Sequence, residues 1–209
     1  GTIPPLSEEE WNVEFDAYKE TPQYQKINQG MSLKDFKFIY FWEYFHRLWA
    51  RLMGFVFIIP AFFFWWKGYL PPWIKLRIVT IFLLAGLVAS FGWIMVASGL
   101  IDRPWVSAYR LSFHLILAVI LLGYLFWTIL QSYTISLIND KVLSNAVKLL
   151  SWGLLIQIFL GGMVSGMKAA LLYPTFPRMN GEWIPSLIFN SSNWKVENFL
   201  SYENSPFFP

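Results

Sequence analysis

The chain has 209 residues, of which 56 % are hydrophobic, 20 % aromatic and only 14 % charged, and its formal net charge is +3. A typical soluble domain has about a quarter charged residues, so this composition argues against a soluble protein and favours an integral membrane protein. The 16 basic residues are spread over several loops, which argues against a nucleic-acid-binding stripe, and the lack of cysteine excludes disulfides, thiolate metal sites and thiol redox chemistry.

The N-terminal 35 residues are polar and rich in acidic side chains, which predicts a loop outside the membrane. The stretch SEEEW, which begins at Ser7, is typical of a helix N-terminus, because a serine cap and an acidic first turn both stabilise the start of a helix. We therefore predict a short helix over residues 7–18 within this loop.

Four long apolar segments follow, and each approaches the roughly 20 mostly apolar residues that a spanning helix needs. We predict transmembrane helices over residues 36–67, 76–97, 109–132 and 144–172. The predicted fold class is therefore an all-α integral membrane protein, with four transmembrane helices of an antiparallel bundle over residues 36–172 and extramembrane loops over residues 1–35 and 173–209. Because the chain does not begin with methionine and starts and stops in loop-like sequence, we expect it to be an interior part of a longer membrane protein.

The positive charges predict how the helices are oriented. Segments 67–77 and 133–148 together hold five Lys or Arg and one Asp, whereas segment 98–108 holds only Asp102 and Arg103. Because basic residues concentrate on the inner side of a membrane, the first two segments are predicted to lie inside. The N-terminal loop and the C-terminal tail are then both predicted to lie outside.

Small residues recur four positions apart in the second and fourth predicted helices, in the latter as Gly162 and Gly166. This spacing allows two helix backbones to approach closely. We interpret it as ordinary packing between membrane helices.

The two histidines of the chain, His46 and His114, fall in the first and third predicted membrane helices. An ionisable residue within a membrane helix indicates a functional site by default. His46 precedes the inner end of its helix by 20 residues and His114 by 16, so on these parallel helices their depths differ by about 6 Å. At this similar depth the two imidazoles could face each other across a cavity.

A haem iron is the group that this pair fits best. The porphyrin supplies four of the six iron ligands, so one histidine from each of two helices completes the set. A bare metal ion usually needs three or four protein ligands, and here only Glu43 offers a third. The alternative is a pair of hydrogen-bonded structural histidines.

Charged residues accompany both histidines. Arg47, Arg51 and Arg110 lie near the outer ends of the same two helices, where they could bind haem propionates, because arginine binds carboxylates in a bidentate geometry. The alternative is that they extend to the lipid head groups. Glu43 lies one turn before His46, either as a salt-bridge partner of Arg47 or as a carboxylate beside a bound ring, placed to move protons or stabilise developing positive charge.

Three motifs, in this order, carry a resemblance to a known family. The stretch EYFHRLWARLMGF resembles the E-x-x-H-R signature at the start of the second helix of haem A synthases. FGWIMVASGL followed by VSAYRLSFH resembles that family's next loop and its second histidine, and YPTFPRMNGEWIP resembles the stretch after its fifth helix. The match extends over roughly residues 35–186, and the long cysteine-free first loop is similar to the mitochondrial and proteobacterial-type branch.

The resemblance implies an eight-helix protein of two pseudo-symmetric halves, each with a bis-His haem site near the outer face. This chain would cover family helices two to five and hold the substrate haem O, with His46 and His114 as axial iron ligands and Glu43 near the reacting methyl. The implied reaction oxidises the C8 methyl of haem O, through an alcohol, to the formyl group of haem A for cytochrome c oxidase. The haem b site of the other half would lie outside this chain, so the chain alone is not expected to catalyse.

The resemblance also implies a setting. The expected partners are the lipid bilayer, haem O and the enzyme that produces it, and an electron donor, with a homo-oligomer as a further option. The expected location is the bacterial cytoplasmic membrane or the mitochondrial inner membrane.

Two routes for the oxidation stay open at this point. Three classes of function also stay open, and the haem A synthase is the first of them. Oxidation at the iron requires one histidine to dissociate, because a bis-His iron has no open position. Electron withdrawal from the ring, which we favour, would let Glu43 stabilise positive charge at the methyl or accept its proton. The competing classes are a bis-His b-type membrane cytochrome that only transfers electrons, and a transporter or assembly protein whose histidines bind no cofactor.

Overall fold

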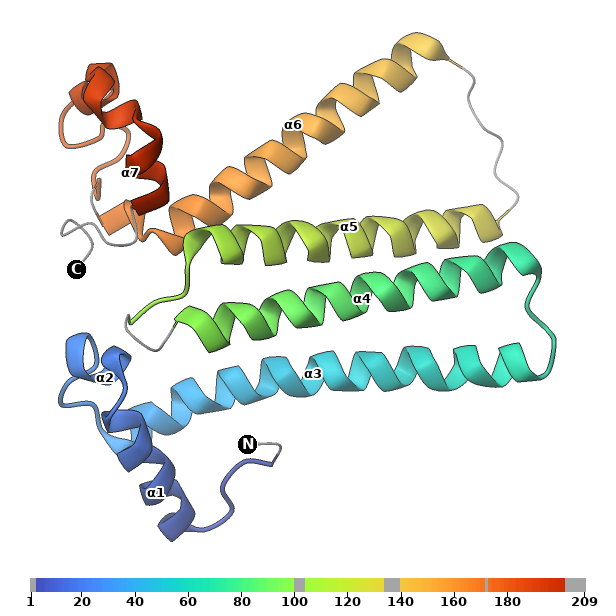
Figure 1. The fold of residues 1–209 in the computed structure, drawn as a ribbon, viewed down its shortest axis with the longest axis horizontal. Helices are drawn as coiled ribbons and strands as arrows, with labels where there is room; N and C mark the ends of the chain where they lie inside the picture. The colour runs from blue at the N-terminus through green and yellow to red at the C-terminus, as the bar shows by residue number, and fades with distance from the viewer. Residues whose placement is uncertain (1–2, 100–103, 134–139, 172, 202–209) are drawn as a thin grey trace. The chain divides into compact units, whose positions relative to one another are not determined.

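The computed structural model describes residues 3–99, 104–133, 140–171 and 173–201 (Figure 1). All regular secondary structure in this part of the chain is helical, which confirms the all-α prediction. Four of its helices are long and apolar enough to cross a membrane, and these are α3 (Leu33–Trp66), α4 (Pro72–Gly99), α5 (Ala108–Ser132) and α6 (Lys141–Gly166). The predicted loop around Asp102 and Arg103 lies outside the described residues.

The chain divides into two units. The first unit comprises residues 1–105 and 118–136, and the second comprises residues 106–117 and 137–209. Helix α5 is continuous, with its first turns in the second unit and the rest in the first.

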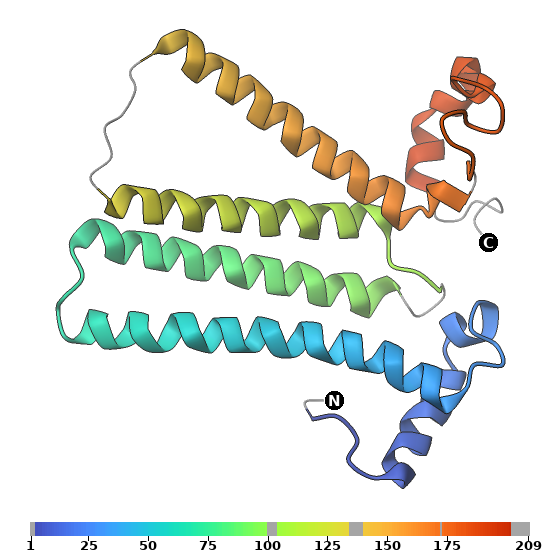
Figure 2. The same cartoon turned by 180° about the vertical axis from the view of Figure 1, so that it is seen from behind.

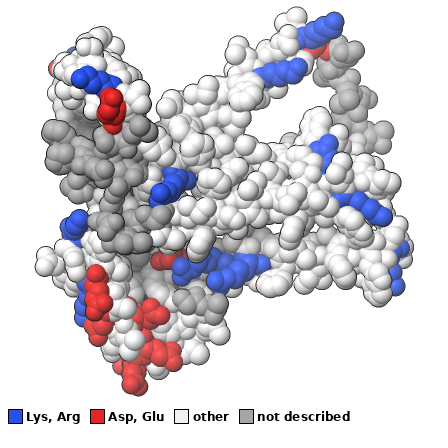
Figure 3. All heavy atoms as spheres, in the orientation of Figure 1, with Lys and Arg blue, Asp and Glu red and all other residues white. Residues whose placement is uncertain are grey.

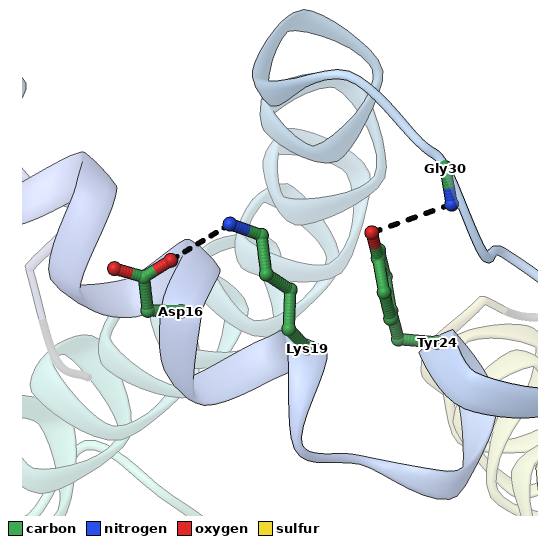
Figure 4. A network of polar contacts seen from close by, with 4 residues as sticks. All are labelled: Asp16, Lys19, Tyr24 and Gly30. Atoms are coloured by element: carbon green, nitrogen blue, oxygen red, sulfur yellow. Dashed lines mark hydrogen bonds and ion pairs between the residues drawn. The ribbon is translucent and has the colours of Figure 1, made fainter.

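The N-terminal loop contains two short capped helices, α1 (Glu8–Lys19) and α2 (Pro22–Lys26). The predicted start of α1 is confirmed, because the Ser7 hydroxyl accepts a hydrogen bond from the backbone N–H of Glu10 at 3.2 Å. Figure 4 shows two further polar contacts of this region, in which Lys19 binds Asp16 at 2.8 Å and the backbone N–H of Gly30 donates to the Tyr24 hydroxyl at 3.3 Å.

An aromatic cluster joins α1 and α2 to the start of α3, and both short helices lie against that end of α3 in Figures 1 and 2. Its buried centre is Phe15, Phe36 and Tyr40. The Phe36 ring lies 5.1 Å from Phe15 and 4.9 Å from Tyr18, and the Trp11 ring lies 5.0 Å from Tyr40. Such ring pairs contribute about 0.5–1.5 kcal/mol each beyond the area that they bury, so the cluster fixes α1 against α3.

The length of α3 explains how it takes part in this cluster. At 1.5 Å per residue its 34 residues extend about 51 Å, whereas the hydrocarbon core of a bilayer is only about 30 Å thick. Several turns must therefore extend beyond the hydrocarbon, and the first turns pack against α1. The helix starts at Leu33, where Ser32 caps it, three residues before the predicted membrane segment 36–67, and it continues through Pro60.

The bounds of two other helices differ from the prediction for local reasons. Helix α4 starts at Pro72 instead of residue 76, and proline is favoured at the first position of a helix. Helix α6 starts at Lys141 because the Asp140 carboxylate caps it, and it ends at Gly166 instead of residue 172. The residue that follows the C-cap, Lys168, has φ 52°, and this left-handed conformation ends a helix.

Within the second unit, α5 and α6 cross closely through small residues. A Cβ atom built on Gly162 would lie 2.6 Å from the Ser112 hydroxyl oxygen, and one built on Gly166 would lie 2.5 Å from the Cα of Ala108. The packing predicted for the Gly162–Gly166 pair is therefore confirmed, and its counterpart is a second pair with the same spacing, Ala108 and Ser112. The small residues of α4 differ, since a Cβ on Gly86 would meet nothing within 4 Å.

Most large apolar side chains of the four long helices are exposed. Apolar surface on this scale is not left in contact with water by a soluble protein, and it marks a surface for lipid or protein. Together with the length and hydropathy of the helices, it identifies the chain as part of an integral membrane protein.

Candidate functional site

The two histidines lie in separate units. His46 is exposed on α3, 20 residues before the last residue of that helix, Trp66. His114 is half-buried on α5, 18 residues before Ser132. Their meeting at one ligand stays a prediction. No cluster of three His, Cys, Asp or Glu suited to a metal ion occurs in the described part of the chain.

The ion pair between Glu43 and Arg47 is present. Arg47 Nη1 donates to Glu43 Oε1 at 2.5 Å across one turn of α3, and the Arg47 side chain is 36 % and the Glu43 side chain 55 % exposed. An exposed pair of this kind contributes only about 0.3–0.5 kcal/mol. It positions the carboxylate one turn from His46, and it leaves much of that carboxylate accessible to another group.

The surroundings of His46 on α3 are apolar and open. On the same face of α3 as His46, Trp42 is four residues before it, Trp49 three residues after it and Met53 seven residues after it. All three side chains are exposed. Ala50, one turn after His46, adds almost no bulk. A flat apolar group that approached His46 would therefore find large apolar side chains beside it and space one turn along the helix.

Arginines lie close to both histidines along the two helices. Arg47 and Arg51 are one turn apart on α3, and Arg51 is exposed. Arg110 is half-buried in the first turn of α5, four residues before His114 and on the same face. Each helix thus carries a cation near its histidine, and the binding of haem propionates by these arginines stays a prediction.

The crossing with α6 fixes which side of α5 His114 occupies. Ser112 is fully buried against Gly162, and the Phe113 ring lies 5.5 Å from that of Phe159 on α6. At about 100° per residue, His114 is about 200° around the helix from Ser112. His114 therefore lies on the side of α5 that is turned away from α6.

Tyr40 was not singled out by the sequence, although it is buried on α3 one turn before Glu43. Its side chain is 9 % exposed, and its hydroxyl has no hydrogen-bond partner among the described residues. The Nε atom of Arg47, two turns further along, is likewise buried without a partner there. Only the aromatic character of Tyr40 was visible in the sequence, and its burial depends on α1.

The Tyr40→Phe variant will be as stable as the unmodified protein or more stable, by up to about 1 kcal/mol, because it removes a buried hydroxyl that forms no bond. The matched control is Tyr18→Phe, which removes the hydroxyl that accepts from the Asn28 side chain at 2.7 Å and should destabilise by about 1 kcal/mol. Thermal unfolding followed by tryptophan fluorescence measures both. A larger loss in Tyr40→Phe than in Tyr18→Phe would show that this hydroxyl is bonded.

The motif stretch after α6 forms a tight turn, which is not among the predicted elements. Met179 and Glu182 exchange backbone hydrogen bonds of 2.8 and 3.2 Å, while Asn180 and Gly181 between them have φ 54° and 94°. These values match a type I′ turn, for which Asn-Gly is the preferred sequence. The Glu182 carboxylate also accepts from the backbone N–H of Ser186 at 2.6 Å, which ties the turn to the residues that follow.

Comparison with known proteins agrees with the motifs. A family described as "Cytochrome oxidase assembly protein" matches residues 1–205. The chain is 42 % identical over 210 residues to the heme A synthase of Nitrosospira multiformis, covering 96 % of this chain and 57 % of that protein. It is 42 % identical over 195 residues to the heme A synthase of Brucella ovis, covering 93 % and 54 %, and 43 % identical over 195 residues to that of Brucella anthropi, covering 93 % and 55 %.

The chain therefore spans about half the length of the curated relatives that it matches. No solved structure matches it. A family match that extends over nearly the whole chain, together with relatives above 40 % identity, shows that this chain belongs to the haem A synthase family of cytochrome oxidase assembly proteins.

Proposed function

We propose that this chain is the part of a haem A synthase that binds the substrate, haem O, and positions its C8 methyl group for oxidation to the formyl group of haem A. The observation that carries the proposal is the identity of 42 % to heme A synthases over 96 % of the chain. That match includes the helix on which Glu43, His46 and Arg47 lie within two turns.

The residues present fit a haem. Imidazoles at positions 46 and 114 are suitable axial ligands, and the apolar face around His46 suits the edge and faces of a porphyrin. Each histidine is followed one turn later by alanine, Ala50 on α3 and Ala118 on α5, which leaves space for a macrocycle beside the imidazole. His46 is 20 residues before the end of α3 and His114 is 18 residues before the end of α5. These two distances differ by about 3 Å of helical rise.

The chain's own groups have separate tasks in this proposal. His46 and His114 would hold the haem iron, and the haem supplies the methyl group that is oxidised. In the route that we favour, oxidation of the methyl group to the formyl group would pass four electrons to an external acceptor, and water would supply the formyl oxygen. Glu43, held by Arg47, would accept a proton that the methyl group releases. Arg47, Arg51 and Arg110 bind and orient the propionates, and the exposed tryptophans near His46 keep bulk water from the ring.

The purified full-length protein tests this function by its spectrum and its product. We expect a Soret band, and a formyl haem after extraction from cells that supply haem O. His46→Ala and His114→Ala should each abolish low-spin haem binding in this half of the protein, whereas Tyr24→Phe, which alters an exposed contact of α2, should not. A bound haem without any formyl product would instead indicate a b-type cytochrome that only transfers electrons, and no Soret band would overturn both readings.

A further inference from the structure

An apolar groove lies between the C-terminal half of α3 and the N-terminal half of α4, both in the first unit. Its volume is about 220 Å³, and it is lined only by apolar and aromatic residues, among them Phe57, Ala61 and Trp65 of α3 and Ile78 and Phe82 of α4. The proposed haem ligand on α3, His46, is 11 residues before the first of these, about 16 Å along the helix. The groove is therefore separate from the candidate haem site.

Lys75 lies near the groove-lining Trp65, and Lys67 is the residue that caps the end of α3, two residues after Trp65. The Lys75 ammonium is 5.7 Å from the ring centre of Trp65, which itself lines the groove, and the Lys67 ammonium is 5.2 Å from the ring centre of Trp66. Trp65 therefore both lines the groove and lies next to the Lys75 ammonium. The neighbouring Arg77 is held by α5, through Gln131 at 2.6 Å and the Tyr124 ring at 4.8 Å.

Negative charge is absent from this part of the sequence. Residues 44–101 contain no Asp or Glu, and neither Lys67 nor Lys75 takes part in an ion pair among the residues that the structure describes. Figure 3 shows basic and no acidic side chains at the end where α3 and α4 are connected. An apolar groove with Lys75 at its Trp65 and Lys67 at the end of α3 is complementary to a molecule with an apolar chain and an anionic head.

We propose that this groove binds one anionic phospholipid, with an acyl chain along Ala61 and Phe82 and the phosphate at Lys67 and Lys75. The predicted orientation puts this end on the inner side of the membrane, which carries the anionic lipids that basic residues bind. Trp65 and Trp66 lie where tryptophan is favoured, at the boundary between acyl chains and head groups. The lipid would hold α3 and α4 together along the groove that both helices line.

Native mass spectrometry of the detergent-solubilised full-length protein tests this inference, with dioleoylphosphatidylglycerol and dioleoylphosphatidylcholine as the added lipids. We expect phosphatidylglycerol to be retained in preference to phosphatidylcholine. The Lys67→Gln/Lys75→Gln double variant should lower phosphatidylglycerol retention about tenfold, and Ala61→Phe, which fills the groove, should lower the retention of both lipids.

The control is Lys148→Gln, which removes an exposed lysine of α6 that does not line the groove, and it should bind both lipids like the unmodified protein. Equal retention of the two lipids by the unmodified protein overturns the inference. So does unchanged phosphatidylglycerol retention in either the lysine double variant or Ala61→Phe, provided that the thermal unfolding midpoint shows the variant to be folded.

Discussion

Replacing Glu43 with glutamine in the full-length protein will stop the formation of formyl haem and leave haem binding intact. Glutamine keeps the size and the hydrogen-bonding capacity of the side chain, but it can neither accept a proton at neutral pH nor stabilise positive charge. Loss of a positioned general base costs about 10²–10⁴-fold in rate. Haem content from the absorption spectrum and extracted haem A per bound haem measure the two effects separately.

The ion pair with Arg47 supplies the control for this result. Glu43→Gln and Arg47→Gln both remove the charge pairing between these residues, but only the first removes the carboxylate. The pair is exposed and contributes about 0.3–0.5 kcal/mol, which is too little to account for a loss of 100-fold or more. We therefore expect Arg47→Gln to lower haem content, through lost propionate binding, and to keep turnover per bound haem.

Equal loss of turnover in the two variants would contradict a proton-accepting role and leave Glu43 as a salt-bridge residue. Full activity of Glu43→Gln would have the same consequence. Since the effect is read per bound haem, neither outcome depends on whether haem O binds where we propose, which the histidine variants test separately.

The positions of the helices could be predicted because local signals fix them. The Ser7 cap and the acidic first turn indicate the start of α1 without any contact between distant segments. Long apolar runs indicate the four long helices in the same way. The end of α6 was placed six residues too late, because apolar character continues to Leu172 and does not reveal that Lys168 adopts φ 52°. The Asn-Gly pair at residues 180–181 is a local signal for the turn, and it lies within the stretch that resembles the family motif.

Features that depend on contacts between distant segments could not be predicted in the same way. Ala108 and Ser112 stand at the start of α5 without a pattern that distinguishes them from other small residues, and their role is visible only against Gly162 and Gly166. The burial of Tyr40 likewise depends on Trp11 of α1. The Glu43–Arg47 pair, by contrast, needs only helical spacing, so it was available from the sequence.

Replacing Gly162 or Gly166 with alanine will destabilise the protein by about 1–3 kcal/mol, the usual cost of overpacking a close contact. The added Cβ would lie 2.6 Å from the Ser112 hydroxyl oxygen or 2.5 Å from the Cα of Ala108. In the second case the obstacle is backbone, so α5 and α6 must move apart. The midpoint of thermal unfolding, followed by tryptophan fluorescence, measures the loss.

Gly161→Ala is the matched control, because a Cβ at this neighbouring position would meet nothing within 4 Å. Alanine is favoured over glycine within a helix by up to about 1 kcal/mol, so this variant should be as stable as the unmodified protein or slightly more so. Equal destabilisation by Gly161→Ala and Gly162→Ala would refute the close crossing. Because His114 is two residues from Ser112 on α5, moving the helices apart should also shift the Soret band in Gly162→Ala and leave it unchanged in Gly161→Ala.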